Sequence, residues 1–280
     1  MKTIGIVGAG QMGSGIALVC ATAGLNVVLN DLDERAVKRG IDSISANLAQ
    51  MISKGKTTSD EAQRALVRIT GDTTLTELVE CDFVIEVATE NVQIKEKLLR
   101  KLDTIVRPGT AIATNTSSVS ITKLGGVLAD PSRLIGMHFF NPVPVMALVE
   151  VIRGLQTGDA AFNATIGLAE RIGKSAICVK NSPGFVVNRI LIPMINEAIF
   201  VLQEGLASAA EIDAGMKQGA NHPIGPLALA DLIGLDTVLA IMNVLHRDFN
   251  DSKYRPAPLL REMVDAGYLG RKSGQGFHTY

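Results

Sequence analysis

The segment Thr3-Ile4-Gly5-Ile6-Val7-Gly8-Ala9-Gly10-Gln11-Met12-Gly13 gives the strongest indication of the fold of the N-terminal part of the chain. A short apolar run leads into a Gly-x-Gly-x-x-Gly pattern, and helical periodicity follows from residue 12 to residue 23. Gly8 permits a tight turn, Gly10 lets the backbone approach a pyrophosphate, and Gly13 lets the helix pack closely on the strand. The helix N-terminus then offers N–H groups to phosphate oxygens. The pattern therefore predicts a dinucleotide-binding turn.

A carboxylate closes the second apolar run. Residues 27–29 are apolar, and Asp31 lies 18 positions after Gly13. At this position a carboxylate hydrogen-bonds the ribose hydroxyls of NAD and repels the 2′-phosphate of NADP. Alternatively, residues 30–33 form only a solvated turn, and the nearby cation of Arg35 could accept a 2′-phosphate. The glycine pattern favours the first interpretation, so we predict NAD as the cofactor.

Apolar runs and helical patterns continue to alternate up to about residue 180. Strands are expected at residues 3–7, 27–29, 83–87, 111–113 and 134–137, with helices between them that include residues 34–53 and 60–67. Fully apolar strands that alternate with helices form a parallel sheet covered on both faces. We therefore predict the α/β class, with an N-terminal Rossmann-type doubly wound sheet.

The pattern changes at Ser182-Pro183-Gly184, a strong break after which only helices are expected. These helices cover residues 185–202, 208–218, 226–249 and 258–265. Residues 185–202 are apolar on nearly every side, which predicts a helix buried all round, within a bundle or against another subunit. We expect two domains, a Rossmann-type domain at 1–182 and an all-helical C-terminal domain at 183–280.

Composition excludes several classes of function. The 280 residues carry a net charge of -1, which argues against nucleic acid or an anionic membrane as the main partner. No apolar stretch is long enough for a membrane span, and the N-terminus has no apolar signal segment. Cys20, Cys81 and Cys178 form no Cys-x-x-Cys pair, so we interpret them as buried apolar side chains, not as a disulfide or metal framework. A cytoplasmic protein without a metal is expected.

Polar side chains gather after the apolar run at residues 111–113. Asn115-Thr116-Ser117-Ser118 follows this run directly, at the sheet edge where doubly wound proteins bind their ligands. Serine and threonine are also the preferred N-caps of helices. From the residues alone, a helix cap and a catalytic role are equally well supported, and one segment could serve both.

Two later residues have the chemistry of a base and its orienting partner. His138 follows the apolar run at 134–137, and Glu150 stands between two valines in a strand-like segment. A carboxylate there is costly to bury without a partner, and a neutral imidazole can accept the proton of an alcohol. Either side chain could instead be an ordinary packed residue. Asn188 lies on an apolar helix, where a core hydrogen-bonding role is favoured over a substrate contact.

The ordered motifs together are specific. They are Gly8-x-Gly10-x-Met12-Gly13, Thr114-Asn115-Thr116-Ser117-Ser118, His138-Phe139-Phe140-Asn141-Pro142, Ser182-Pro183-Gly184-Phe185-Val186-Val187-Asn188-Arg189, Asn221-His222-Pro223-Ile224-Gly225-Pro226 and Gly270-Arg271-Lys272-Ser273-Gly274. Over essentially its whole length the chain resembles the 3-hydroxyacyl-CoA dehydrogenase family, most of all its bacterial 3-hydroxybutyryl-CoA dehydrogenases. The resemblance implies interconversion of (S)-3-hydroxybutyryl-CoA and acetoacetyl-CoA with NAD.

The resemblance also implies a role for each catalytic candidate. His138 matches the general base, and Glu150 matches the partner that holds its imidazole. Ser117 matches the serine that hydrogen-bonds the reacting oxygen of the substrate, and Asn188 the asparagine that helps to position it.

Binding roles follow from the same match. The implied cofactor contacts are Gly8, Gly10, Gln11, Met12, Gly13, Asp31, Glu90, Lys95, Asn115, Asn141 and Lys272. Lys54 and Asn47 fall where the family contacts CoA, and no metal is implied. The helical domain would form the interface of a homodimer, with residues 182–184 as a hinge.

Two other functions compete with this one. A related NAD-dependent dehydrogenase could act on a free hydroxy acid instead of a CoA thioester. A non-catalytic NAD-binding protein is the other alternative, but it would have no need of a base with an oriented partner.

Overall fold

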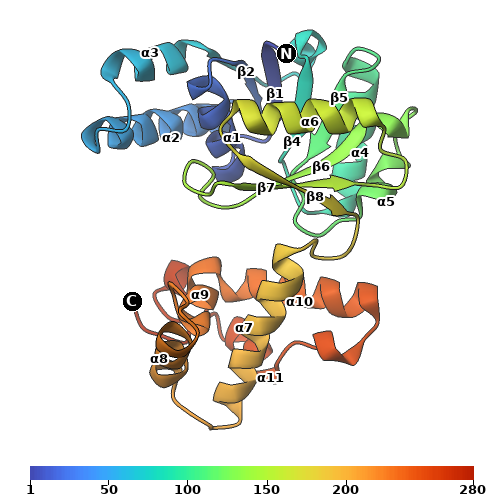
Figure 1. The fold of residues 1–280 in the computed structure, drawn as a ribbon. Coiled ribbons are helices and arrows are strands. Elements are labelled where there is room, and N and C mark those ends of the chain that lie inside the picture. The colour runs from blue at the N-terminus through green and yellow to red at the C-terminus, as the bar shows by residue number, and fades with distance from the viewer. The chain divides into compact units, whose positions relative to one another are not determined.

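The apolar runs of the first half of the chain form one sheet in the computed structural model, which describes residues 1–280. The chain divides into two compact units, Met1–Asn181 and Ser182–Tyr280 (Figure 1). The first unit is an eight-stranded sheet with helices packed on it. The second is built of helices.

The sheet has the strand order β3-β2-β1-β4-β5-β6-β7-β8. Its strands are β1 (Thr3–Val7), β2 (Asn26–Asn30), β3 (Ile69–Asp72), β4 (Phe83–Glu86), β5 (Ala111–Thr114), β6 (Leu134–Phe139), β7 (Leu148–Arg153) and β8 (Ser175–Lys180). All pairs from β3 to β6 are parallel. The order reverses at β1, which lies between β2 and β4, and ligands of such sheets bind at the carboxyl ends of the strands on either side of this point.

Six helices belong to the first unit. They are α1 (Gln11–Thr22), α2 (Glu34–Ser53), α3 (Ser59–Val67), α4 (Val92–Ile105), α5 (Ile121–Gly125) and α6 (Asp159–Arg171). Figure 1 shows α6 lying across the sheet, where it contacts β5 to β8, while α1 packs against β1 and β2. Local sequence fixes the helix starts: Asp33 and Asn91 cap α2 and α4, and Thr58 with Glu61 forms a capping box on α3.

The predicted fold class is confirmed, with one error in strand direction. We expected a uniformly parallel sheet, but β7 runs antiparallel to β6. Only residues 140–147 separate the two strands, too few for the crossover connection that a parallel pair requires, so the chain turns back as a hairpin. β3 and β8 were not predicted, because these edge strands leave most of their side chains partly or fully exposed and have no continuous apolar run.

Cys178 was also interpreted wrongly. Cys20 and Cys81 are buried as expected, but Cys178 is exposed, because it lies on the edge strand β8. Burial raises the pKa of both Cys20 and Cys81 to about 12, so these two thiols stay protonated.

The second unit packs its helices around α7 (Figure 1). The helices are α7 (Val187–Gln203), α8 (Ala209–Gly219), α9 (Pro226–Ile233), α10 (Leu235–Phe249) and α11 (Pro258–Asp265). Their core consists of aliphatic side chains that include Ile195 and Ile199 of α7 and Leu245 of α10. None of the helices is by itself long and apolar enough to cross a membrane, and α9 with α10 passes that test only as a pair bent by 98°.

One expectation for the second unit is wrong. Residues 226–249 form two helices instead of one, because Gly234 has a φ of 99° and turns the chain between them. Ile190 of α7 is 67% exposed within the chain, so the expectation of a helix covered on every side, within a bundle or against another subunit, remains a prediction. Both α9 and α10 are rich in apolar side chains, so hydrophobicity alone does not reveal the break between them.

Candidate active site at the carboxyl ends of the strands

The glycine-rich turn has the shape that a bound pyrophosphate requires. Gly8 has a φ of 113°, and its N–H donates to the carbonyl of Asn30 at 2.8 Å. A Cβ on Gly13 would lie 1.8 Å from the Gly8 carbonyl oxygen, so only glycine allows α1 to begin here. No side chain caps the first turn of α1, where Gln11 is exposed and Met12 half-buried. The first N–H groups of this helix are thus positioned for an anion.

Asp31 joins this turn to the end of β2. Its Oδ2 accepts the N–H of Ala9 at 2.8 Å, and its Oδ1 accepts the N–H of Leu32 at 2.8 Å. A carboxylate offers about four acceptor positions, so both oxygens retain lone pairs for ribose hydroxyls. The residues of this turn therefore fit a dinucleotide.

The polar segment after β5 is held by hydrogen bonds from two sides. The Asn115 side-chain oxygen accepts the N–H of Phe139 at 2.8 Å, which joins this segment to the end of β6. The Glu90 carboxylate accepts the Thr116 hydroxyl at 2.6 Å and the Ser117 N–H at 2.8 Å. Ser117 is half-buried and follows directly after Asn115 and Thr116, whose side chains are held by these hydrogen bonds.

The helix-cap interpretation of Ser117 and Ser118 is wrong. The residue that caps α5 is Ser120, whose side chain accepts the N–H of Lys123 at 3.2 Å. Thr116 stabilises a turn within this segment, because its hydroxyl oxygen accepts the N–H groups of Ser118 and Val119.

His138 and Glu150 form a buried pair. They face each other in the antiparallel register of β6 and β7, which puts both side chains on the same face of the sheet. His138 Nδ1 lies 2.8 Å from Glu150 Oε2, and Glu150 is fully buried. Since a carboxylate only accepts hydrogen bonds, Nδ1 carries the hydrogen and Nε2 carries the lone pair of the neutral ring. The Phe140 ring packs against the imidazole, with the two ring centroids 4.6 Å apart.

A buried lysine holds the loop that connects the two strands of this pair. The Lys174 ammonium donates to the carbonyls of Val143, at 2.5 Å, and Met146, at 2.7 Å. Burial lowers the pKa of Lys174. Asn141, one of the predicted cofactor contacts, is exposed at the start of the same loop.

Lys95 does not lie on the surface of the site as a cofactor contact would suggest. It is 1% exposed, and its ammonium lies 2.5 Å from Glu86 and 3.3 Å from the Thr114 hydroxyl. Its contact with the cofactor remains a prediction. The sequence analysis does not predict Glu86, although it is, like Asp31, a carboxylate at the end of an apolar run.

The remaining predicted residues lie on other elements. Lys54 is exposed at the C-terminus of α2, one to two turns beyond the exposed Asn47, whose amide donates to the carbonyl of Ser43. In the second unit, Asn188 is buried on the first turn of α7, at 9% exposure. The Lys272 ammonium lies 2.5 Å from Asp236, so a carboxylate already accompanies this cation.

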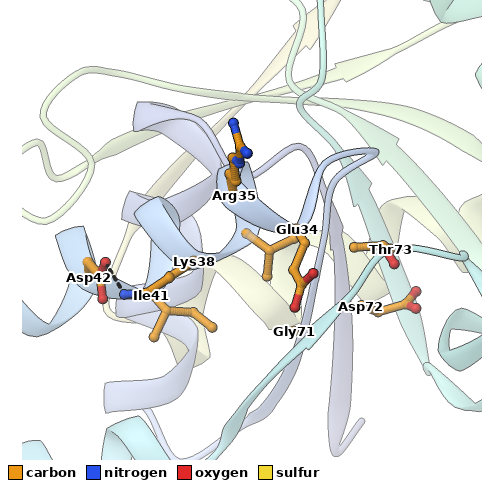
Figure 2. Close-up of a pocket in the computed structure, with 9 residues that line it drawn as sticks. Glu34, Arg35, Lys38, Ile41, Asp42, Gly71, Asp72 and Thr73 are labelled. Atoms are coloured by element: carbon orange, nitrogen blue, oxygen red, sulfur yellow. Dashed lines mark hydrogen bonds and ion pairs between the residues drawn. The ribbon is translucent and has the colours of Figure 1, made fainter.

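A groove of about 710 Å³ lies elsewhere, between α2 and β3 (Figure 2). Figure 2 shows the side chains of Lys38 and Asp42 on its wall, paired with each other. The Lys38 ammonium lies 2.8 Å from the Asp42 carboxylate, one helical turn away. None of the predicted site residues lines this groove. No group of three or more His, Cys, Asp or Glu side chains is arranged to hold a metal ion.

The fold and these side chains define a class of protein. A glycine-rich turn at the switch point of a doubly wound sheet, a carboxylate at the end of β2 and a histidine oriented by a buried carboxylate are the parts of a nicotinamide-dependent dehydrogenase.

The chain belongs to the 3-hydroxyacyl-CoA dehydrogenase family: residues 3–182 match its NAD binding domain and residues 184–280 its C-terminal domain. The resemblance seen in the sequence and the prediction of NAD as cofactor are confirmed.

Individual relatives match the chain from end to end. The chain is 50% identical to a 3-hydroxybutyryl-CoA dehydrogenase of Bradyrhizobium diazoefficiens, with 100% of this chain and 96% of that protein covered. It is 51% identical to a probable 3-hydroxybutyryl-CoA dehydrogenase of Bacillus subtilis, with 100% and 98% covered. The crystal structure of (S)-3-hydroxybutyryl-CoA dehydrogenase from Ralstonia eutropha is 59% identical and has a TM-score of 0.97, with 100% and 99% covered.

Proposed function

We propose that this protein interconverts (S)-3-hydroxybutyryl-CoA and acetoacetyl-CoA with NAD. The observation that carries the proposal is the His138–Glu150 pair, because a binding protein has no use for a base held by a buried carboxylate. The names and full-length identity of the relatives support the choice of a four-carbon CoA thioester over a free hydroxy acid.

His138 and Glu150 handle the proton of the reaction. In the oxidising direction His138 Nε2 accepts the proton of the C3 hydroxyl, and Glu150 stabilises the imidazolium that results. Bound NAD supplies the acceptor for the hydride that leaves C3. In the reducing direction the imidazolium returns its proton to the oxygen of the ketone.

Ser117 and Asn188 are proposed to contact the reacting oxygen. A hydroxyl and an amide that donate to this oxygen stabilise the charge that develops on it in the transition state. Ser117 is suited to the role because its own N–H is fixed by Glu90, which limits where its side chain can lie.

Binding roles follow for the other predicted residues. We propose that the cofactor is held by Gly8, Gly10, Gln11, Met12, Gly13, Asp31, Glu90, Lys95, Asn115, Asn141 and Lys272. Lys54 and Asn47 are proposed to meet the CoA part of the substrate, where the Lys54 cation suits a phosphate.

The assembly and location are proposals as well. We propose a cytoplasmic homodimer joined through the helical unit. The exposed Ile190, Leu206 and Leu232 of that unit support the interface, and three free thiols suit a reducing compartment.

The direct test of the function follows the oxidation of NADH with acetoacetyl-CoA and, separately, with free acetoacetate. We expect turnover with the thioester alone, and with NADH in strong preference to NADPH. Equal turnover with the free acid would make the protein a hydroxy-acid dehydrogenase. Binding of NADH without turnover of either substrate would leave only a binding protein.

A further inference from the structure

Glu86 is a buried carboxylate at the carboxyl end of β4 that the proposed reaction does not use. It is fully buried, and each oxygen has its own donors. Oε2 accepts from the Lys95 ammonium at 2.5 Å and from the Thr114 hydroxyl at 2.7 Å. Oε1 accepts the N–H of Ala88 at 3.0 Å.

Stability alone does not explain this group. Burying two charges removes both from water, and an apolar pair of similar volume is often as stable as a buried ion pair. What the ion pair adds is a fixed geometry, since an ammonium, a hydroxyl and a backbone N–H converge on one carboxylate.

The Ala88 hydrogen bond anchors a short loop that leads to Ser117. Residues 87–90 connect the end of β4 to Glu90, and Glu90 in turn accepts the Thr116 hydroxyl and the Ser117 N–H. Glu86 also lies opposite Thr114 in the register of β4 and β5. Thr114 in turn precedes Thr116 by two residues. The loop is thus tied to the Ser117 segment at both of its ends, by Glu86 through Thr114 and by Glu90 through Thr116.

We infer that Glu86 is a positioning residue for Ser117: with Lys95 and Thr114 it fixes the 87–90 loop, so that Glu90 holds the Ser117 backbone where the hydroxyl meets the substrate oxygen. The inference rests on the proposed function, which assigns Ser117 to that oxygen. Glu86 acts entirely through other residues, because it is itself enclosed by the protein.

The first unit contains a matched control. Arg133 and Asp103 form a second buried ion pair at 3.0 Å, with side-chain exposures of 8% and 12%. Asp103 lies on the same helix as Lys95, but Arg133 directly precedes the amino end of β6, whereas Glu86 and Ser117 lie at or after the carboxyl ends of their strands. Loss of this pair should reduce stability without affecting Ser117.

The test compares Glu86→Gln and Thr114→Val with Asp103→Asn. Thr114→Val keeps the shape of a buried residue and both charges, so it tests the same hydrogen-bond network even where Glu86→Gln folds poorly. For each variant we would measure kcat and KM for acetoacetyl-CoA, the melting temperature, and hydrogen exchange of the backbone N–H of Ser117.

We expect Glu86→Gln to lower kcat by about 10- to 100-fold while KM for acetoacetyl-CoA stays within about threefold, because a misplaced catalytic group slows the reaction more than it weakens binding. Thr114→Val should lower kcat in the same way but less. Both should speed exchange at Ser117. Asp103→Asn should lower the melting temperature and leave kcat and Ser117 exchange unchanged.

The inference is overturned if Glu86→Gln and Thr114→Val lose as much melting temperature as Asp103→Asn but show the same kcat and the same rate of hydrogen exchange at the Ser117 N–H as that control. Absence of thioester turnover by the unmodified protein would contradict the proposed function instead. In that case Ser117 exchange still decides whether Glu86 fixes this segment.

Discussion

At the level of single residues, the proposed site depends on pairs in which one side chain fixes another. Glu150 orients His138, Glu90 holds Ser117, and Asp31 ties the glycine-rich turn to β2. In each pair a carboxylate accepts hydrogen bonds that leave its partner only one useful position. Charge on these carboxylates therefore matters as much as their shape.

Glu150→Gln tests the charge at the base. Glutamine can still accept the Nδ1 hydrogen but no longer stabilises the imidazolium, so we expect kcat to fall by about 10²-fold or more with little change in KM for NADH. Steady-state kinetics with acetoacetyl-CoA measures this. A kcat within about twofold of the unmodified protein would show that the carboxylate only packs.

Asp31→Ala tests the choice of cofactor. Loss of the carboxylate removes the repulsion of a 2′-phosphate and also the hydrogen bond from the Ala9 N–H. We therefore expect kcat/KM for NADH to fall. The ratio of kcat/KM for NADPH to kcat/KM for NADH should rise by about tenfold. Asp42→Ala, which removes an exposed partner of Lys38, is the control and should leave the ratio unchanged. An unaltered ratio in Asp31→Ala would refute the ribose role.

Individual residues show how far the sequence could predict the site. The glycine turn, Asp31 and the polar segment at Asn115 were recognisable because strand ends and glycine patterns carry their own chemistry. His138 and Glu150 could be paired as chemical types, but their contact depends on the antiparallel turn of β7, which no local pattern announces. The burial of Lys95 could not be predicted for a different reason. Its partner Glu86 lies nine residues earlier, at the end of a strand, so no helical spacing relates the two residues.

At the scale of helices and strands, the boundaries were predictable where a cap or an apolar run marks them. α2 begins at Glu34 as predicted, with Asp33 as its cap, and β1, β4 and β5 are largely apolar segments. The edge strands β3 and β8 lack that signal because their side chains face solvent. The break between α9 and α10 lacks it because both helices are apolar and a single glycine turns the chain.

Gly234→Ala tests this break. A φ of 99° is strained for alanine, and a Cβ would lie 3.0 Å from Asp236 and Lys272, so we expect a loss of stability of about 1–3 kcal/mol. Gly215→Ala is the matched control, because Gly215 lies inside α8 with no atom within 4 Å of an added Cβ. It should raise the melting temperature, since alanine favours a helix. Thermal unfolding measures the melting temperature of both variants. An equal change in melting temperature in the two would contradict the positive φ of Gly234.

For the molecule as a whole, the exposed apolar side chains of the helical unit support the proposed self-association surface. Ile190 is 67% exposed on α7, a helix otherwise rich in buried aliphatic residues. A helix with apolar side chains on nearly every side is expected to be covered on every side, so we expect a second copy of the chain to cover Ile190.

Ile190→Glu should therefore shift the protein from a dimer toward a single chain of 29.7 kDa. Light scattering coupled to size-exclusion chromatography measures the mass. Leu155→Glu, at a residue 88% exposed on the first unit, should leave the dimer intact. A dimer that persists in Ile190→Glu would place the interface elsewhere.

The role of His138 as the base of the reaction is tested by NADH oxidation with acetoacetyl-CoA in the His138→Asn variant. Binding of NADH to the same variant is followed by NADH fluorescence. We predict that NADH binding survives while kcat falls by about 10³-fold or more, because no other group is held in place to give the ketone its proton. A variant that binds NADH and retains kcat within about tenfold of the unmodified protein would contradict the mechanism.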